Sequence, residues 1–354
     1  MRITTTIPQH NLRAVFPAAT AIEHAGYDGI MTLENRHDPF LPLAVAATCT
    51  NKVELSTGIA ISFLRSPMST ANLTWDLNEA SGGRFVLGLG TQIRAHNEKR
   101  FSVPWTAPAP RMREYVQALR AIWRTWKYDE PLGFVGKHYR FTLMIPNFVP
   151  EKSGLKLPAV TLAAVGPAML SLSAEVADGV RLHPFCTRKY LDDIVLPRLA
   201  AGLSKAERKR ENFEIGGGGF LATGSDDESV AKSIEWVRYR IAFYGSTPAY
   251  WPVLEAHDEG DLGRKLNQMT KAGQWDKIAA EISDDMVRLF AAIGRHDEIA
   301  GAIKQRFGGA SDTIYASTSS EIQSDLPADL ISDIQAIESP FTEYDTESRP
   351  SGPQ

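Results

Sequence analysis

The sequence predicts an α/β protein that folds as a closed (β/α)8 barrel, a TIM barrel, with a single domain over residues 1–340. Short β-rich runs alternate with helical patterns along the chain, most connections between them are short, and eight such runs can be counted. Strands that alternate with helices run parallel, and their right-handed crossovers build either a closed barrel or an open, doubly wound sheet. The count of eight favours the barrel.

The predicted strands are short runs rich in apolar and β-branched residues. They span residues 2–6, 30–33, 53–61, 85–89, 158–163, 180–182, 213–221 and 312–316. Residues 290–293 form either a further short strand or an extended linker. The run 85–89 is apolar throughout, as in a strand buried on both faces, and it begins after the helix stop Gly82-Gly83. Gly88 and Gly90 at its end indicate a tight turn or a close approach to the backbone.

The helical patterns repeat apolar residues at intervals of three and four. The clearest of them is a single stripe of seven side chains: Met112, Tyr115, Val116, Leu119, Ile122, Trp123 and Trp126. Two insertions interrupt the alternation, after the fourth and the seventh strand. We expect a hairpin at about residues 131–145, a mostly helical excursion at about 247–285, and a flexible C-terminal tail over 341–354.

Composition excludes several classes of function. The chain has 354 residues and a net charge of -4, which favours neither a nucleic acid nor an anionic membrane as partner. It has two cysteines, no apolar run long enough to cross a membrane and no apolar leader segment. We therefore expect a soluble, cytoplasmic protein.

In a barrel of this kind the active site lies at the carboxyl ends of the strands. The second strand ends at Glu34, the fourth at Gly90, Thr91 and Gln92, and the sixth at His183. After the fifth strand, Gly166-Pro167 opens a helix whose free amides and dipole could hold an anion, although an ordinary turn would have the same sequence.

Other kinds of site have weaker patterns. Glu34, His37 and Asp38 could ligate a metal, but no second histidine pair stands at ligand spacing. The run from Gly88 to Ile93 lacks the third glycine of a dinucleotide-binding loop. No Gly-x-Ser-x-Gly elbow for a serine nucleophile occurs in the sequence.

Several motifs along almost the whole chain match one known family. They are Asp38-Pro39-Phe40-Leu41-Pro42-Leu43, Leu55-Ser56-Thr57-Gly58-Ile59-Ala60, Arg65-Ser66-Pro67-Met68, Ser81-Gly82-Gly83-Arg84-Phe85 with Leu87-Gly88-Leu89-Gly90, Pro108-Ala109-Pro110-Arg111-Met112-Arg113-Glu114-Tyr115, Gly166-Pro167-Ala168-Met169, Ala177-Asp178-Gly179-Val180 and Phe243-Tyr244-Gly245-Ser246-Thr247-Pro248. With these motifs the sequence resembles the luciferase-like monooxygenase superfamily. More narrowly, it is similar to the branch that uses the deazaflavin coenzyme F-420.

The resemblance implies where a cofactor would lie. It implies a (β/α)8 barrel of the luciferase-like type, with a non-proline cis peptide between Gly58 and Ile59 behind the deazaflavin ring. Glu34 and the strand end at Gly90, Thr91 and Gln92 would line the ring. The cofactor phosphate would lie on the segment after the fifth strand, namely Ala164, Val165, Gly166 and Pro167.

The resemblance also implies the reaction. We expect an oxidoreductase that transfers a hydride between coenzyme F-420 and a small alcohol, ketone or enone. His183 would act as general acid or base, Glu34 would share this work, and Phe63, Trp105 and Phe185 would wall the substrate pocket. Gln92 and Ile93 stand where sugar-phosphate dehydrogenases of the superfamily have an acid, which argues against that activity.

Three alternatives remain open from the sequence. One is an FMN-dependent luciferase-like monooxygenase, which would need oxygen and a reductase partner. Another is a metal-dependent barrel hydrolase that uses Glu34, His37 and His183, and a third is a cofactor-binding protein without catalysis. The leading hypothesis has no metal and no macromolecular partner except a second copy, because family habit suggests a homodimer.

Overall fold

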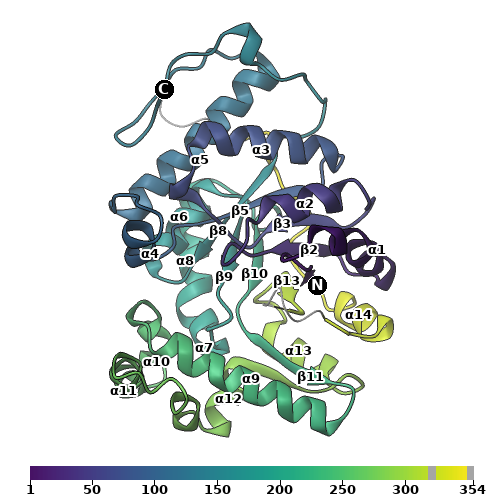
Figure 1. Cartoon of the computed structure of the whole chain (residues 1–354), viewed down its shortest axis with the longest axis vertical. Helices are drawn as coiled ribbons and strands as arrows, with labels where there is room; N and C mark the ends of the chain where they lie inside the picture. Colours follow the sequence, from purple (N-terminus) through teal and green to yellow (C-terminus); the bar gives the residue numbers. More distant parts are fainter. Residues whose placement is uncertain (318–323, 349–354) are drawn as a thin grey trace.

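The computed structural model describes residues 1–317 and 324–348, and its centre is a closed ring of eight parallel strands (Figure 1). The strands are β1 (Arg2–Thr6), β2 (Gly29–Thr32), β3 (Glu54–Thr57), β5 (Phe85–Gly90), β8 (Ala159–Ala164), β9 (Gly179–Leu182), β10 (Glu214–Gly217) and β13 (Thr313–Tyr315). Pairing of β3 with β5 closes the ring, and the short β4 (Ala60–Ile61) continues from β3 alongside β5. The predicted (β/α)8 barrel is confirmed.

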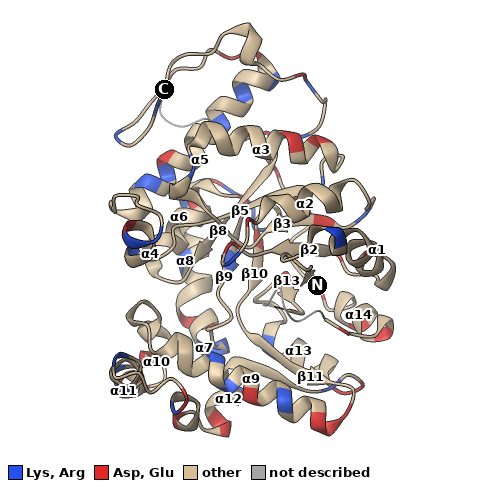
Figure 2. Cartoon of the chain, viewed as in Figure 1, with Lys and Arg blue, Asp and Glu red and all other residues tan. Residues whose placement is uncertain are grey.

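Helices cover the outside of the ring (Figure 1). They are α1 (Val15–Ala25), α2 (Phe40–Ala47), α3 (Pro67–Ala80), α4 (Arg94–Lys99), α5 (Pro108–Tyr128), α6 (Pro167–Val176), α7 (Arg188–Tyr190), α8 (Leu196–Lys205), α13 (Ile299–Phe307) and α14 (Ala328–Gln335). Within the described residues, no helix is both long and apolar enough to cross a membrane. Charged residues lie mostly on helices and loops, while the strands are largely uncharged (Figure 2).

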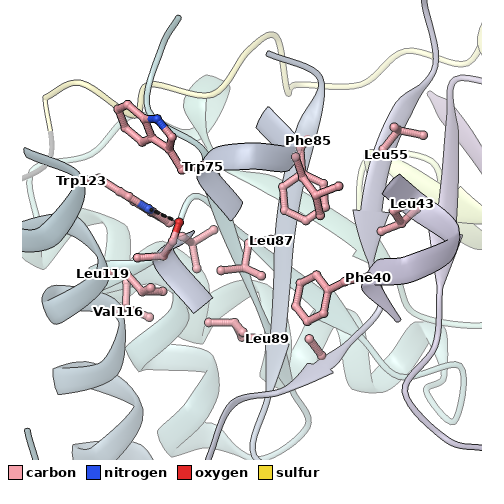
Figure 3. Close-up of a cluster of buried hydrophobic side chains, with 14 of the residues drawn as sticks. Phe40, Leu43, Leu55, Trp75, Phe85, Leu87, Leu89, Val116, Leu119 and Trp123 are labelled. Atoms are coloured by element: carbon pink, nitrogen blue, oxygen red, sulfur yellow. Dashed lines mark hydrogen bonds between the residues drawn. The ribbon is translucent and has the colours of Figure 1, made fainter. Parts of the chain in front are cut away.

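The main hydrophobic core lies between the strands and helices α2, α3 and α5. All seven residues of the predicted stripe on α5 are fully buried there, as expected. Figure 3 shows Leu87 and Leu89 of β5 between Phe40 and the α5 side chains. The Trp123 indole nitrogen donates a hydrogen bond to the Ala71 carbonyl at 3.3 Å, so α5 is also tied to α3.

One predicted strand, 213–221, is wrong as a single strand. The chain leaves the ring after β10, and residues Phe220–Gly224 form β11, which pairs in parallel with β12 (Ala291–Arg295) in a separate two-stranded sheet. Gly217 and Gly218, with φ of 86° and 98°, make the turn between β10 and β11. A Cβ on Gly217 would lie 2.4 Å from the Leu182 carbonyl oxygen, so the glycine run is needed for this exit.

Two insertions interrupt the alternation of strands and helices. A short antiparallel hairpin, β6 (Phe134–Val135) and β7 (Arg140–Phe141), follows α5. Between β11 and β12 the chain forms α9 (Asp227–Gly245), η6 (Pro248–Tyr250), α10 (Trp251–Glu255), α11 (Gly260–Lys271), η7 (Ile278–Glu281) and α12 (Asp284–Phe290). These helices and the β11–β12 sheet form a group beside the barrel, at the bottom of Figure 1.

The C-terminal segment differs from the flexible tail that we expected. Residues 341–348 pack across the amino ends of the strands, where Tyr344 donates a hydrogen bond to Glu214 at 2.5 Å and Lys127 pairs with Glu347 at 2.6 Å. Thr346 is buried as well. These contacts cover charged side chains inside the barrel, which composition and periodicity do not reveal. Residues 349–354 of the expected tail lie outside the described residues.

Candidate active site

The candidate residues lie on five neighbouring strands at the carboxyl end of the barrel. The order β2, β3 with β4, β5, β8 and β9 is continuous around the ring. Ile61 pairs with Gly90, Leu89 with Leu162, and Ala164 with Leu182, so the strand ends meet at one level. The segments that begin at Glu34, Gly58, Gly90, Ala164 and His183 therefore form one arc of the rim.

Glu34 lies at this rim in a tight network of charges and hydrogen bonds. Arg65 binds its two carboxylate oxygens through separate nitrogens, each at 2.8 Å, and the Ile61 amide donates to it at 2.6 Å. Arg65 also reaches Asp38 at 3.1 Å. These two carboxylates raise the pKa of Arg65 against the lowering effect of burial. Donors occupy both oxygens of this carboxylate, and its position suits support of the rim.

The rim between β3 and β4 bulges at Gly58 and Ile59. The peptide bond between them is cis, and the Glu34 amide donates to the Ile59 carbonyl at 3.2 Å. A Cβ on Gly58 would lie 2.0 Å from the sulfur of Met31, so only glycine fits at this position without rearrangement. The bulge is therefore held by the Thr32 carbonyl of β2, which accepts from the Gly58 amide at 2.7 Å, and by the Glu34 amide.

The glycines of β5 are explained by close contacts with the end of β3 and with this bulge. A Cβ on Gly88 would lie 1.8 Å from the Thr57 carbonyl oxygen, and one on Gly90 would lie 2.7 Å from the Ile59 side chain. The close approach that the sequence indicated at these positions is thus made by the neighbouring strand. The space left by the absent side chains holds protein atoms of β3 and the bulge.

Beyond Gly90, the chain turns sharply at Thr91 and Gln92. Gln92 has a φ of 55°, a left-handed conformation that is uncommon for residues other than glycine. Its side-chain oxygen accepts from the Ile93 amide at 2.9 Å, and Asn97 of α4 donates to the Thr91 carbonyl at the same distance. These bonds fix the backbone of both residues next to the rim.

The amino end of α6 has the features of an anion site. Gly166 precedes the helix, no side chain caps its first turn, and a Cβ added at Gly166 would meet no atom within 4 Å. Free amides and the helix dipole there attract negative charge. Pro167 has no N–H to donate, so its part is to start the helix. The next residue, Ala168, is exposed and supplies a further amide that was not among the expected phosphate-binding residues.

His183 follows β9 and is half-buried at the rim. The Phe185 amide donates to its Nδ1 at 2.9 Å, which assigns the proton of the neutral ring to Nε2. Burial lowers the pKa of His183 to about 3, so the imidazole is neutral at physiological pH. In this state the ring offers a hydrogen-bond donor through Nε2. Its role as general acid or base stays a prediction.

The three aromatic residues expected to wall a pocket lie in different environments. Phe63 is buried, and the guanidinium carbon of Arg111 lies 4.3 Å from the centre of the Phe63 ring. Phe185 is buried against Phe290, with the two ring centres 4.6 Å apart. Both therefore contribute to protein packing. Trp105, in the loop between α4 and α5, is half-buried.

Three residues near the candidates were missed as site residues. Arg65 clamps Glu34, and Tyr244 and Tyr250 pack on the imidazole of His183 with ring centres 4.2 and 4.7 Å away. Arg65 and Tyr244 lie in motifs that carry the family resemblance, which was the available signal. Tyr250 could not be found from the sequence because it lies 67 positions beyond His183 in an insertion.

The structure has no cluster of ligands for the metal-dependent hydrolase site within the described residues. Over residues 1–317 and 324–348, no three His, Cys, Asp or Glu side chains are grouped as a metal ion would require. His37 is exposed, and Glu34 is taken up by Arg65. Glu34, His37 and His183 therefore do not form the hydrolase site considered above.

Comparisons with known proteins identify the family of the chain. A family model described as luciferase-like monooxygenase matches residues 2–313. An uncharacterized protein of Mycobacterium tuberculosis (strain ATCC 25618 / H37Rv) is 46% identical over 314 residues, covering 89% of this chain and 92% of that protein. A 5,10-methylenetetrahydromethanopterin reductase of Archaeoglobus fulgidus is 29% identical over 294 residues, covering 80% and 82%.

Two solved structures share the fold. The coenzyme F-420-dependent tetrahydromethanopterin reductase from Methanopyrus kandleri superposes with a TM-score of 0.74 at 18% identity, covering 95% of this chain and 97% of that one. An F-420-dependent secondary alcohol dehydrogenase in complex with an F-420–acetone adduct gives 0.69 at 15% identity, covering 94% and 98%. Because the family match spans nearly the whole barrel, the chain belongs to the luciferase-like monooxygenase family.

Proposed function

We propose that this protein is an oxidoreductase that transfers a hydride between coenzyme F-420 and a small organic substrate of the alcohol, ketone or enone type. The observation that carries the proposal is the uncapped amino end of α6 beside a rim of five adjacent strand ends. A phosphate-bearing cofactor needs such a set of free amides, and a planar ring needs a rim without long side chains. The two solved structures of this fold that use F-420 support this cofactor.

The residues present fit such a cofactor. The amides of Val165, Gly166 and Ala168 would hold its phosphate, where Gly166 leaves open space. Ile59 and the backbone of Thr91 and Gln92 would contact the ring from the β4 and β5 side. When bound, the deazaflavin supplies a carbon that donates or accepts a hydride.

The protein's own groups would orient the substrate and exclude water. His183, neutral and fixed by the Phe185 amide, would donate a hydrogen bond from Nε2 to a substrate oxygen. Glu34 would support the rim through Arg65 and the Ile61 amide, a more limited part than the proton work expected from the sequence. Trp105 remains the one member of the expected aromatic wall that is partly exposed.

Binding titrations test this proposal. The purified protein is titrated with oxidised F-420 and, separately, with FMN, and coenzyme fluorescence is followed. We expect F-420 to bind in the micromolar range and FMN at least tenfold more weakly. A Gly166→Asp variant, which adds negative charge at the α6 terminus, should weaken F-420 binding more than tenfold, whereas Gly166→Ala should not.

The opposite result favours the second candidate. Tight binding of FMN alone would reject the F-420 proposal and leave the FMN-dependent monooxygenase. The homodimer and the cytoplasmic location also stay predictions, and analytical ultracentrifugation and cell fractionation test them.

A further inference from the structure

Two tyrosines from the insertion that follows β11 enclose the imidazole of His183. Tyr244 lies near the end of α9, and its ring meets His183 edge-on at 78°, with centres 4.2 Å apart. Tyr250 ends η6 and packs on the same imidazole at 4.7 Å with the planes 44° apart. The insertion therefore reaches the rim of the barrel at the residue that is our candidate for contact with the substrate.

Aromatic side chains next to Tyr250 hold its ring in place. Its ring meets Phe185 edge-on at 5.6 Å, and Phe185 packs on Phe290. The next residue, Trp251, donates from its indole nitrogen to the Gly245 carbonyl at 3.1 Å and packs over Gly263, where a Cβ would come within 2.7 Å. This packing fixes η6 against the end of α9.

The hydroxyl groups of the two tyrosines differ. The Tyr244 hydroxyl has a hydrogen bond with Arg240. For the Tyr250 hydroxyl, no hydrogen-bond partner exists among residues 1–317 and 324–348, although the side chain is half-buried. Burial, together with Tyr244, raises the pKa of Tyr250, so its hydroxyl stays protonated. The Tyr250 hydroxyl is not among the fully buried polar atoms of the described residues, so an incoming ligand oxygen can reach it and accept its hydrogen bond.

We propose that Tyr250 is a substrate-orienting residue whose hydroxyl and the Nε2–H of His183 donate hydrogen bonds to one uncharged oxygen of the substrate. The inference rests on the proposed function and names the substrate class, a ketone or enone presented through its carbonyl oxygen. Two neutral donors suit a carbonyl oxygen, which has two lone pairs and no proton of its own. Donors placed at an oxygen also stabilise negative charge that develops there, so the pair suits reduction of a carbonyl compound.

Substitution of the hydroxyl alone tests this inference through binding as well as turnover. Cyclohex-2-enone is titrated into the protein loaded with oxidised F-420, where no hydride can be transferred, and binding is followed by calorimetry and by the ¹⁵N signals of His183. We expect Tyr250→Phe to weaken enone binding at least fivefold and to leave the affinity for F-420 unchanged. Tyr239→Phe is the matched control, because Tyr239 lies on the same insertion, is exposed and stacks on Phe243.

The outcomes separate the two proposals. If the wild-type protein binds F-420 but Tyr250→Phe binds the enone as well as wild type does, the inference about Tyr250 is wrong and the proposed function stands. Absence of enone binding to the wild-type protein, or an unchanged His183 Nε2 signal on its addition, would also overturn it. If the protein does not bind F-420, the proposed function fails first, and the same titration on unloaded protein still tests Tyr250.

Discussion

Arg65 binds Glu34 through both of its terminal nitrogens, each 2.8 Å from a different carboxylate oxygen. The Ile61 amide donates to the same carboxylate, so Glu34 joins the end of β2 to the bulge between β3 and β4. With donors on both of its oxygens, Glu34 holds this part of the rim in shape. Its side chain is 10% exposed and that of Arg65 is 19% exposed, so solvent screens the pair only weakly.

Replacement of Glu34 should therefore reduce stability more than it changes the pH dependence of turnover. We expect Glu34→Gln to lower the free energy of unfolding by about 1–3 kcal/mol, because a neutral amide replaces charge-assisted hydrogen bonds. Urea unfolding of the variant measures this. Asp38→Asn is the control, since Asp38 shares Arg65 but is more exposed, and asparagine can still accept a hydrogen bond from the Phe40 amide. Equal stability of the two variants would show that the clamp is unimportant.

His183 should produce a characteristic loss of stability in acid. Its pKa is about 3 in the folded protein and about 6.5 in an unfolded chain, so the unfolded state binds the proton first. The free energy of unfolding therefore decreases as the pH falls from about 6.5 toward 3. Above pH 6.5 His183 is neutral in both states, and this loss of stability is absent. Urea midpoints at pH 7.5 and 4.5 should differ less for His183→Gln than for wild type.

The same shift bears on catalysis. Between pH 5 and 8 the imidazole stays neutral, so the pH profile of turnover should show no limb from His183. If turnover of the wild-type protein changes near pH 6.5 and this change disappears in His183→Gln, then the imidazole titrates in that range. His183 would then be the general acid or base that the sequence predicted.

The barrel could be predicted because the patterns that indicate it depend on residues that are close together in the sequence. Apolar runs, helical stripes such as the one on α5, and glycine turns each depend on neighbouring residues, and together they specify the alternation of strands and helices. The arc of strand ends followed from the same reasoning, because parallel strands bring their carboxyl ends to one edge. Glu34 and His183 were placed at the rim for this reason.

What the sequence could not predict depends on contacts between distant segments. The pairing of Arg65 with Glu34 spans 31 positions, and that of Tyr250 with His183 spans 67. The exit of the chain at Gly217 was missed, since a glycine run inside a β-rich segment resembles one continuous strand. The burial of Phe63 and Phe185 was also hidden, because aromatic residues in loops give no sign of their neighbours.

A buried group of charges at the amino end of the barrel explains why the C-terminal segment is ordered. Arg2 pairs with Glu54 at 2.8 Å and reaches Glu214 at 3.4 Å, and Arg181 lies 3.7 Å from both carboxylates. Burial alone would raise the pKa of Glu214, but Arg181, Arg2 and the hydroxyl groups bonded to it hold that pKa below its usual range. Tyr344 supplies one of those hydroxyl groups and covers the cluster.

Removal of this segment should therefore destabilise the protein. We expect a chain that ends at residue 340 to unfold at a clearly lower temperature than the full chain, because buried charges would be opened to water. A chain that ends at residue 348 keeps all the described contacts and serves as the control. Tyr344→Phe isolates one hydrogen bond to a carboxylate, and its loss should cost about 1–3 kcal/mol. Equal melting of the two shortened chains would mean that the segment does not support the barrel.

Gly88 offers the sharpest test of the rim. A Cβ at this position would lie 1.8 Å from the Thr57 carbonyl oxygen, a backbone atom that moves only if β3 moves. Gly90→Ala would instead meet the flexible Ile59 side chain at 2.7 Å, and Gly133→Ala would meet no atom within 4 Å. We expect Gly88→Ala to cost about 3 kcal/mol or more, or to prevent folding, Gly90→Ala to cost less, and Gly133→Ala to be nearly neutral. Thermal unfolding measures the series. A folded and fully stable Gly88→Ala protein would mean that β3 and β5 are not in close contact, and the bulge that we assign to the cofactor site would then lack its support.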